Sequence, residues 1–209
     1  TEVDLAQIKY YSFKKGEVAG IDNVLISATG YTGAGGFELY VEETNALKLW
    51  DILVEKGEKY GLQLAGLGCR DTLRLEMGYC LYGNDIDDTT SVLEAGLGWI
   101  TKLNKDKFIQ KEFLLNQKAE GISRKLVGFR LEERRVPRHG YQILNNLGEP
   151  IGVVTSGTMS PTLNYPIGMG YVAFSEAKVG NTIHISMGNK SLPAQTVKCP
   201  FLEKGNELK

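Results

Sequence analysis

The chain has 209 residues, of which 42% are hydrophobic and 23% are charged, a balance typical of folded globular proteins and not of disordered ones. It carries 24 Lys and Arg residues against 25 Asp and Glu residues, and the formal net charge of -1 gives no support for binding to nucleic acid or to an anionic membrane surface. The length allows one large domain or two small ones, and no apolar run is long enough to span a bilayer.

The chain begins with strand-like segments. Short runs rich in β-branched and aromatic residues, bounded by glycines, predict strands over residues 8–13, 24–28 and 37–41. The first residue is Thr1 and not Met, and the first predicted strand follows almost at once. We therefore expect a fragment or a processed product.

Helix-like and strand-like segments alternate over the next part of the chain. Helical spacing of apolar residues predicts helices over about 44–60, 68–77 and 108–117, and we expect the last to connect two domains. Residues 83–91 form a polar, acidic loop, and residues 97–101 have strand character. The residues at helical spacing in the first helix are Leu47, Trp50 and Leu53; the apolar side of the last helix is expected to hold Phe108, Ile109, Phe113 and Leu114.

From about Lys125 the chain consists of short strands separated by turns that carry Asn, Gly or Pro. Regular spacing of this kind predicts a small barrel or a sandwich. The predicted strands are 126–131, 141–144, 151–155, 170–174, 182–186 and 194–197.

The cysteines and histidines do not follow a metal-binding or disulfide pattern. Cys69, Cys80 and Cys199 are an odd number at wide spacing, which favours reduced thiols in an intracellular compartment. His139 and His184 lie far apart, and the sequence contains neither CxxC nor HxxxH. We therefore expect no metal site.

A glycine-rich segment over residues 29–37 separates two predicted strands and ends at Glu38. It is not a phosphate-binding loop, because no Lys-Ser/Thr pair and no helix follow its glycines. The simpler interpretation is a tight connection that needs positive φ angles. Glu38 remains unexplained, since a carboxylate in an apolar strand should either face solvent or be held for a ligand.

Two other motif matches are rejected on context. Residues 168–173 fit GxGxxA, but they lead into a strand-prone run and not into the helix that a dinucleotide site requires. Residues 82–88 are rich in side-chain oxygens, but they lack the length, the central Gly and the closing Glu of an EF-hand loop.

The segment 66–76 holds two arginines on one side of a predicted helix. Arg70 in the first turn could project its guanidinium toward a carboxylate or a polar ring edge. The alternative is a purely local role, with Asp71 near the helix N-terminus and Arg74 in nearby ion pairs.

Four stretches together resemble a known family: GYTGAGGFE, GLGCRDTLRLEMGYCLYGNDID, LEAGLGW and GVVTSGTMSPTLNYPIGMGYV. They occur in the order that they take in the glycine cleavage system T-protein family, the folate-dependent aminomethyltransferases. The similarity extends over almost all of the chain. Its most specific parts are the stretch from RDTLRLE to YGNDID and the stretch TSGTMSPTL.

The resemblance implies that Glu38 corresponds to the carboxylate that hydrogen-bonds the pterin ring of tetrahydrofolate, and Arg70 to the arginine that contacts the bound folate or substrate. An ionised Glu suits this role, because the pterin's amino and ring N–H groups form a donor pair that a carboxylate can accept twice. The implied reaction moves a methylene group from the aminomethyl-lipoyl arm of the H-protein to tetrahydrofolate and releases ammonia. The implied partners are the lipoylated H-protein and the other glycine cleavage components, in the bacterial cytoplasm or the mitochondrial matrix.

The resemblance also implies an α+β fold: a partial folate-binding α+β domain over residues 1–104, a linker helix within 105–124, and a small antiparallel β-barrel domain over 125–209. The family's acid/base aspartate belongs to an N-terminal portion expected before Thr1. No catalytic residue is therefore expected in this chain, and the chain alone should be inactive.

Some positions depart from the family pattern. Ala34 stands where the family usually has an acidic residue, and the family usually has a proline near Val92. The C-terminal GNELK has no counterpart to a tyrosine that some members use.

The sequence leaves three alternative functions. They are the folate-binding portion of a dimethylglycine or sarcosine dehydrogenase, a non-catalytic folate-binding relative that serves iron–sulfur cluster assembly, and an oligonucleotide-binding barrel. The intact YGNDID and TSGTMSPTL stretches favour the aminomethyltransferase over the non-catalytic relative.

Overall fold

A computed structural model describes residues 1–202, so the C-terminal GNELK lies outside the described residues. The described chain divides into two compact units, residues 1–70 and residues 71–202. Each unit has a hydrophobic core of its own. Among the described residues, no helix is both long and apolar enough to cross a membrane.

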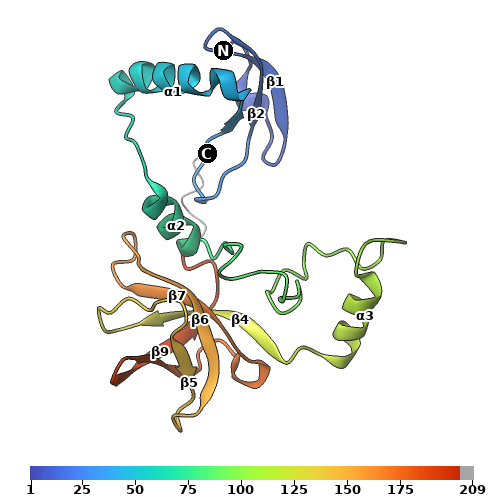
Figure 1. The fold of residues 1–209 in the computed structure, drawn as a ribbon, viewed down its shortest axis with the longest axis vertical. Helices are drawn as coiled ribbons and strands as arrows, with labels where there is room; N and C mark the ends of the chain where they lie inside the picture. The colour runs from blue at the N-terminus through green and yellow to red at the C-terminus, as the bar shows by residue number, and fades with distance from the viewer. Residues whose placement is uncertain (203–209) are drawn as a thin grey trace. The chain divides into compact units, whose positions relative to one another are not determined.

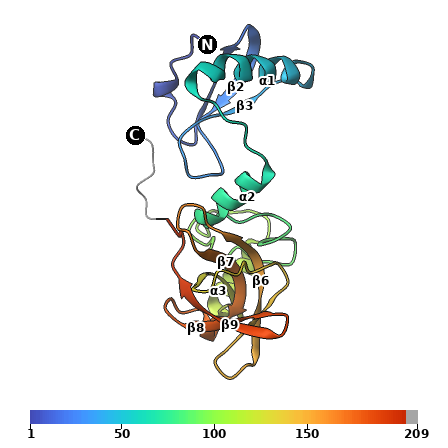
Figure 2. The ribbon, with the colours of Figure 1, turned by 90° about the vertical axis from the view of Figure 1, so that its left-hand side faces the viewer.

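The first unit is a three-stranded antiparallel sheet with a helix across one face (Figure 2). Its elements are η1 (Leu5–Gln7), β1 (Phe13–Val18), β2 (Ile21–Ser27), β3 (Glu38–Tyr40), α1 (Glu43–Gly57) and η2 (Glu58–Tyr60). β1 and β2 form a hairpin, and β2 also pairs with β3, which makes β2 the central strand. Leu49 of α1 is buried together with Val24 and Ile26 of β2, so the helix closes the core over this strand.

Helix α1 confirms the first predicted helix, but it is apolar on two sides. Leu49 faces the sheet and is 4% exposed. Leu47 and Trp50, whose spacing predicts the helix, are 71% and 53% exposed. Because successive residues of an α-helix are rotated by about 100°, Leu47 and Trp50 share a side that points away from Leu49.

The second unit contains a closed antiparallel barrel (Figure 1). The order of its strands around the barrel is β4-β7-β6-β5-β8-β9. Its elements are α2 (Leu67–Glu76, which begins in the first unit), α3 (Lys111–Glu120), β4 (Arg124–Leu131), β5 (Gln142–Leu144), β6 (Pro150–Met159), β7 (Pro166–Ala173), η3 (Phe174–Glu176), β8 (Thr182–Met187) and β9 (Lys190–Val197). The predicted α+β class and the barrel are confirmed, and the closed strand order excludes the sandwich.

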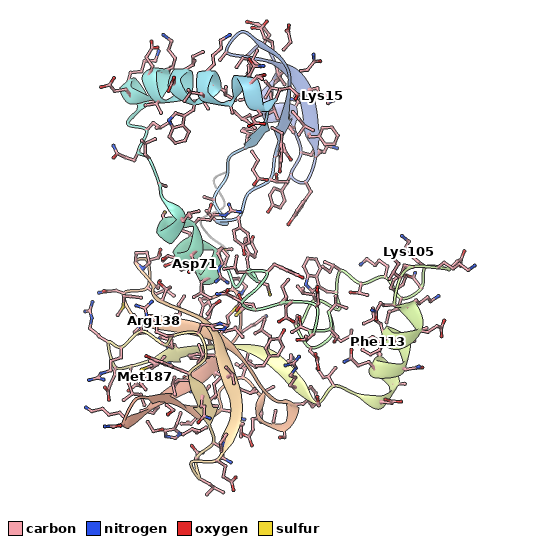
Figure 3. All side chains as sticks on the ribbon, viewed as in Figure 1. Lys15, Asp71, Lys105, Phe113, Arg138 and Met187 are labelled. Carbon is pink, nitrogen blue, oxygen red and sulfur yellow. The ribbon has the colours of Figure 1, made fainter. Side chains whose placement is uncertain are left out.

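The barrel interior is packed with aliphatic and aromatic side chains. Phe129, Ile143 and Ile183 are fully buried there, and Met187, labelled in Figure 3, belongs to the same core. Gly168 of β7 is required by packing, because a Cβ at this position would lie 2.5 Å from the Phe129 ring. The glycines of the GxGxxA match therefore serve strand packing, as the rejection of a dinucleotide site predicts.

The segment 8–13 does not form the strand that its composition predicts. Residues 5–7 form a 3-10 helix instead, and the side chain of Asp4 caps this helix by accepting a hydrogen bond from the Ala6 N–H. The chain then turns, because Tyr11 adopts a left-handed conformation with φ of 61° and the Ser12 N–H donates to the Lys9 carbonyl. β1 consequently begins only at Phe13.

The predicted strand over 97–101 is also wrong. These residues form consecutive turns, in which the N–H groups of Ile100 and Thr101 donate to carbonyls three residues earlier. Gly96, with φ of 73°, reverses the chain just before the segment. Local turn geometry overrides the β-propensity here, because within the described residues the segment is not paired with any strand.

The third predicted helix exists but is displaced toward the C-terminus. Gln110 is left-handed with φ of 69°, so α3 begins at Lys111 and not at Phe108. Leu114 is buried as expected, whereas Ile109 is 91% exposed. The apolar side predicted for this helix is therefore only partly correct.

Candidate functional site

Glu38 opens β3 directly after the glycine-rich loop. Its side chain is half-buried, and its Oε2 accepts a hydrogen bond from Thr29 Oγ1 at the other end of the loop. The hydroxyl of Tyr40 lies 3.5 Å from the same carboxylate oxygen, and Thr29 Oγ1 is 2.9 Å from Ser27 Oγ. Hydroxyl groups from both ends of the loop thus fix the orientation of the carboxylate.

The glycine-rich loop adopts the backbone conformation predicted for it. Gly33 and Gly36 have φ angles of 72° and 143°, which side chains with a Cβ rarely adopt. A Cβ at Gly36 would have no neighbour within 4 Å, so this glycine is needed for its backbone angle and not for space. The loop is a tight strand-to-strand connection that brings Thr29 and Glu38 together.

Arg70 contacts the same loop. It is exposed in the first half of α2, and its guanidinium Cζ lies 4.6 Å from the centre of the Tyr31 ring. Such stacking of a guanidinium on an aromatic face is attractive and restricts the arginine's orientation. Both predicted site residues therefore contact the glycine-rich loop: Glu38 accepts a hydrogen bond from Thr29, and Arg70 stacks on Tyr31. Their roles toward folate stay predictions.

A fully buried ion pair lies one helical turn beyond Arg70. Nη1 of Arg74 donates to Oδ2 of Asp85 at 2.6 Å, and both side chains are at most 1% exposed. Arg74 also donates to Oδ1 of Asp71 from Nε and Nη2, at 2.8 and 2.6 Å. Burial alone would lower the pKa of Arg74, but the carboxylates of Asp85 and Asp71 outweigh it, so the pKa is raised and the side chain stays charged.

The barrel completes the hydrogen bonding of this ion pair. The hydroxyls of Thr155 and Ser156 on β6 donate to the Asp85 carboxylate, as does the N–H of Leu81. Nη2 of Arg74 lies 2.8 Å from Ser156 Oγ. A buried charge pair is tolerable only with such additional hydrogen bonds, because desolvating two charges is costly.

Glu76 forms a second buried polar cluster at the end of α2. Its carboxylate accepts hydrogen bonds from the hydroxyls of Ser160 and Thr162 and from the Thr162 N–H, the latter two at 2.9 and 3.1 Å. Glu76 is 1% exposed. All three groups donate to Glu76, and the Thr162 N–H can only donate, so the cluster is built around an acceptor.

These two clusters join the most specific stretches of the sequence. RDTLRLE supplies Arg74 and Glu76, YGNDID supplies Asp85, and TSGTMSPTL supplies the hydroxyl groups. The sequence predicts local ion pairs for Arg74 without naming a partner, and Asp71, three residues earlier, is one of them. The pairing of Arg74 with Asp85, 11 residues away, and the contacts with hydroxyl groups 70–86 residues away were missed because they depend on the tertiary fold. Since both stretches are used to build a buried network, their presence does not discriminate an active enzyme from a non-catalytic relative.

A surface cavity of about 290 Å³ lies where the loop 84–90 meets β6 and β7. Arg124 borders it, with its guanidinium 4.7 Å from the centre of the Tyr171 ring and Nη2 donating to the Thr89 carbonyl at 3.1 Å. Burial raises the pKa of Tyr171 to about 12, so this hydroxyl is neutral at physiological pH.

Among the described residues, no group of three or more His, Cys, Asp or Glu side chains could hold a metal ion.

Comparison with known families decides the classification. The family model of the GCVT N-terminal domain matches residues 1–105, and the model of the glycine cleavage T-protein C-terminal barrel domain matches residues 124–203. The chain belongs to the glycine cleavage T-protein family. The resemblance inferred from the four stretches is thus confirmed.

Members of the T-protein family with close sequence similarity carry enzyme names. The aminomethyltransferase of Bacteroides thetaiotaomicron is 58% identical over 202 residues, which are 96% of this chain and 56% of the relative. That of Flavobacterium psychrophilum is 53% identical over 204 residues, 98% of this chain and 56% of the relative. The chain spans about half the length of the curated relatives that it matches.

A solved T-protein shares the fold. The crystal structure of glycine cleavage system aminomethyltransferase T from Bartonella henselae matches with a TM-score of 0.87 and 31% sequence identity. The match covers 95% of this chain and 54% of that one. Both units of the present structure therefore have counterparts in this T-protein.

Proposed function

We propose that this chain forms part of a tetrahydrofolate-dependent aminomethyltransferase of the glycine cleavage system, in which Glu38 and Arg70 position the folate. The observation that carries the proposal is the glycine-rich loop, which orients the Glu38 carboxylate through Thr29 and places Tyr31 against the Arg70 guanidinium. The aminomethyltransferase names of relatives that are 53–58% identical support the reaction class.

In the proposed reaction, the aminomethyl-lipoyl arm of the H-protein delivers its methylene group to tetrahydrofolate, and ammonia leaves. Such a transfer depends mainly on holding the folate amine and the carrier carbon in attack geometry in a dry pocket. Glu38 would accept the paired N–H donors of the pterin, which fixes the ring's orientation. Arg70 would contact the bound folate or substrate with a guanidinium that Tyr31 already holds in place.

Both residues act as positioning groups in this proposal, and no residue of the chain is given the acid or base role. An aspartate outside this chain would handle the protons, and we propose that the 209-residue chain by itself does not turn over. The test supplies the purified chain with aminomethylated H-protein and tetrahydrofolate. Production of methylenetetrahydrofolate by the chain alone would contradict this part of the proposal.

The folate assignment is tested by changing the acceptor. The chain is joined to the part of the Bacteroides thetaiotaomicron relative that it does not span, and Glu38→Gln is made in this completed chain. Gln keeps the size of Glu but replaces one acceptor oxygen with an NH₂ donor, which opposes a pterin N–H. Since a hydrogen bond to a charged group contributes roughly 1.5–3 kcal/mol, tetrahydrofolate affinity measured by calorimetry should fall by about one to two orders of magnitude.

The matched control is Glu42→Gln, which makes the same chemical change at an exposed position just before α1. It should leave the folate affinity unchanged. Equal affinities of the Glu38→Gln variant and the parent would reduce Glu38 to a solvated strand residue, and the site assignment would be withdrawn.

We also propose the domain division 1–104, 105–124 and 125–209. The two family matches, to residues 1–105 and 124–203, support it by leaving the intervening segment with α3 unmatched. We propose the bacterial cytoplasm or the mitochondrial matrix as the compartment, in keeping with reduced thiols at the three cysteines.

A further inference from the structure

The Glu38 carboxylate is held through only one of its two oxygens. Hydroxyl groups of Thr29 and Tyr40 lie within hydrogen-bond distance of it, and both contact Oε2. The Tyr40 hydroxyl is 3.5 Å away, which is the outer limit of a hydrogen bond, so Thr29 is the main donor. Oε1 accepts no hydrogen bond from any residue that the structure describes.

The strand register explains why these polar side chains meet. Glu38 of β3 pairs directly with Ser27 of β2, so the two side chains lie on the same face of the sheet. Ile26, whose side chain points to the opposite face, is buried in the core under α1. Thr29 lies two residues after Ser27, just beyond the end of β2, and its Oγ1 is 2.9 Å from Ser27 Oγ. The polar side chains therefore gather on the face that does not meet α1.

The chemistry of the three groups fixes the direction of their hydrogen bonds. A hydroxyl carries one proton, and an ionised carboxylate can only accept. Thr29 therefore gives its proton to Glu38 and can only accept from Ser27. Ser27 is 9% exposed, so its hydroxyl has little water to bond instead. The result is a chain of donors that runs from Ser27 through Thr29 to Oε2 of Glu38.

The hydrogen bond between Thr29 and Glu38 also closes the glycine-rich loop. The two residues are nine positions apart and stand at its two ends. Tyr31, on which Arg70 stacks, lies inside this loop. Loss of the Thr29 hydroxyl would therefore release the carboxylate and loosen the loop that carries the partner of Arg70.

We propose that Thr29 is a positioning residue for tetrahydrofolate, whose hydroxyl occupies Oε2 of Glu38 and leaves Oε1 free to accept from the pterin. The inference rests on the proposed folate role of Glu38 and extends it to a residue that does not itself contact the ligand. A carboxylate offers about four lone-pair sites, of which the Thr29 hydroxyl takes one, so two pterin N–H groups can still be accepted. A carboxylate that is already oriented loses less rotational freedom on binding, which increases the affinity.

The test uses the completed chain, in which this chain is joined to the part of the Bacteroides thetaiotaomicron relative that it does not span. Thr29→Val keeps the shape of the side chain and removes the donor, and tetrahydrofolate affinity measured by calorimetry should fall roughly tenfold. Thr29→Ser retains the hydroxyl and should bind within about twofold of the parent. The matched control Thr44→Val makes the same change at an exposed position in α1 and should leave the affinity unchanged. Hydrogen exchange over β2 should be the same in all variants, which would show that the sheet is folded.

A double-mutant cycle separates a role through Glu38 from a general structural role. Once Glu38→Ala has removed the carboxylate, Thr29→Val should cause no further loss of folate affinity, because the group on which Thr29 acts is gone. A damaged fold would instead weaken binding in both backgrounds. Additive losses of the two substitutions would therefore overturn the proposal.

Two other results would also overturn it: an unchanged affinity of Thr29→Val, or a loss in Thr29→Ser as large as that in Thr29→Val. The failure of this inference can be told from the failure of the proposed function. Weak binding by Glu38→Gln together with normal binding by Thr29→Val would defeat the role of Thr29 alone. Normal binding by both Glu38→Gln and Glu38→Ala would withdraw the folate role of Glu38, and the role of Thr29 with it.

Discussion

Residues 1–70 and the barrel unit use charged side chains in opposite ways. In the barrel unit, Arg74, Asp85 and Glu76 are fully buried, and each is surrounded by groups of complementary hydrogen-bonding character. In residues 1–70, Glu38 is half-buried beside an open loop and Arg70 is exposed. Both the buried and the exposed residues come from stretches that carry the family resemblance. A specific stretch can therefore be required by internal packing as strongly as by chemistry.

The two regions also differ in how they treat apolar side chains. The barrel closes on itself, so every strand has two neighbours and its interior is filled. The three-stranded sheet of the first unit has two edges and a single covering helix. A small open sheet buries less apolar surface per residue than a closed barrel, and its stability depends more on what else covers it.

The largest effect should come from breaking the buried ion pair of the barrel unit. Asp85→Asn leaves the Arg74 charge without its buried partner, and we expect a loss of about 3–5 kcal/mol in the free energy of unfolding. Asp71→Asn is the matched control, because Asp71 pairs with the same arginine but is 52% exposed, and it should cost less than about 1 kcal/mol. Urea titration, monitored by hydrogen exchange over β6, measures the stability loss of both variants. Equal losses would mean that burial does not distinguish the two partners.

The second effect contrasts the two sides of α1. Leu49→Ala removes a buried side chain from the core of the first unit and should cost about 2–5 kcal/mol. Leu47→Ala removes the same atoms from a position that is 71% exposed, and it should change the stability of the isolated chain by less than about 0.5 kcal/mol. Hydrogen exchange over β2 reports on this unit. A substantial loss with Leu47→Ala would show that other residues cover this side of the helix.

The third effect tests Glu76 as the buried acceptor of three hydrogen bonds. Glu76→Gln replaces the carboxylate with a neutral amide, whose NH₂ group fits only if a hydroxyl partner turns to accept and gives up its own donation, and we expect a loss of about 1.5–3 kcal/mol. Glu149→Gln is the control, because Glu149 is an exposed acceptor of the Asn145 amide. It should be nearly neutral. Chemical denaturation of the two variants, compared with the parent, decides whether Glu76 must be an acceptor.

The smallest effect concerns two buried thiols of the barrel unit. Burial raises the pKa of Cys80 to about 11 and that of Cys199 to about 12, from an ordinary value of 9.0. As the pH rises, the unfolded chain releases these protons first, so their contribution to stability is present below pH 9 and is lost as the pH rises through 11 to 12. The urea midpoint should therefore fall slightly between pH 8 and pH 9, where the unfolded thiols begin to ionise, and by less in Cys80→Ala.

The same thiols should react slowly. At pH 8 the thiolate fraction at Cys80 is on the order of 0.1%, and only the thiolate is nucleophilic. Cys69 is exposed in α2, so brief treatment of the native chain with iodoacetamide should label Cys69 before the other two. Mass spectrometry of the digested product gives the order. Rapid labelling of Cys199 would show that its surroundings open readily.

Several elements were predicted well because their signals are local. The six barrel strands alternate with turn residues at short intervals, and the helix at α1 is set by apolar spacing within a few turns. The failures have local causes that composition does not show. Tyr11 and Gln110 are left-handed residues other than glycine, and each of them moved the start of an element.

The candidate site was only partly accessible to sequence reasoning. Glu38 stood out because a carboxylate in an apolar strand after a glycine loop needs an explanation, and the positive φ angles of the loop followed from its glycines. That Thr29 would hold this carboxylate, and that Arg70 would lie over Tyr31, could not be read from spacing. Both contacts depend on how the loop folds back on itself.

The sequence by itself determined the α+β class, the barrel-forming strands, the family and the two residues that deserve testing, because periodicity, turn chemistry and short motifs act over a few residues. Only the tertiary structure decided which charges are buried and which side of α1 is covered. Arg74 and Asp85 find their partners across as many as eighty residues of chain, and a helix with two apolar sides gives no sign in its sequence of which side meets the sheet. Burial is a property of what packs against a residue, and that is set by the fold as a whole.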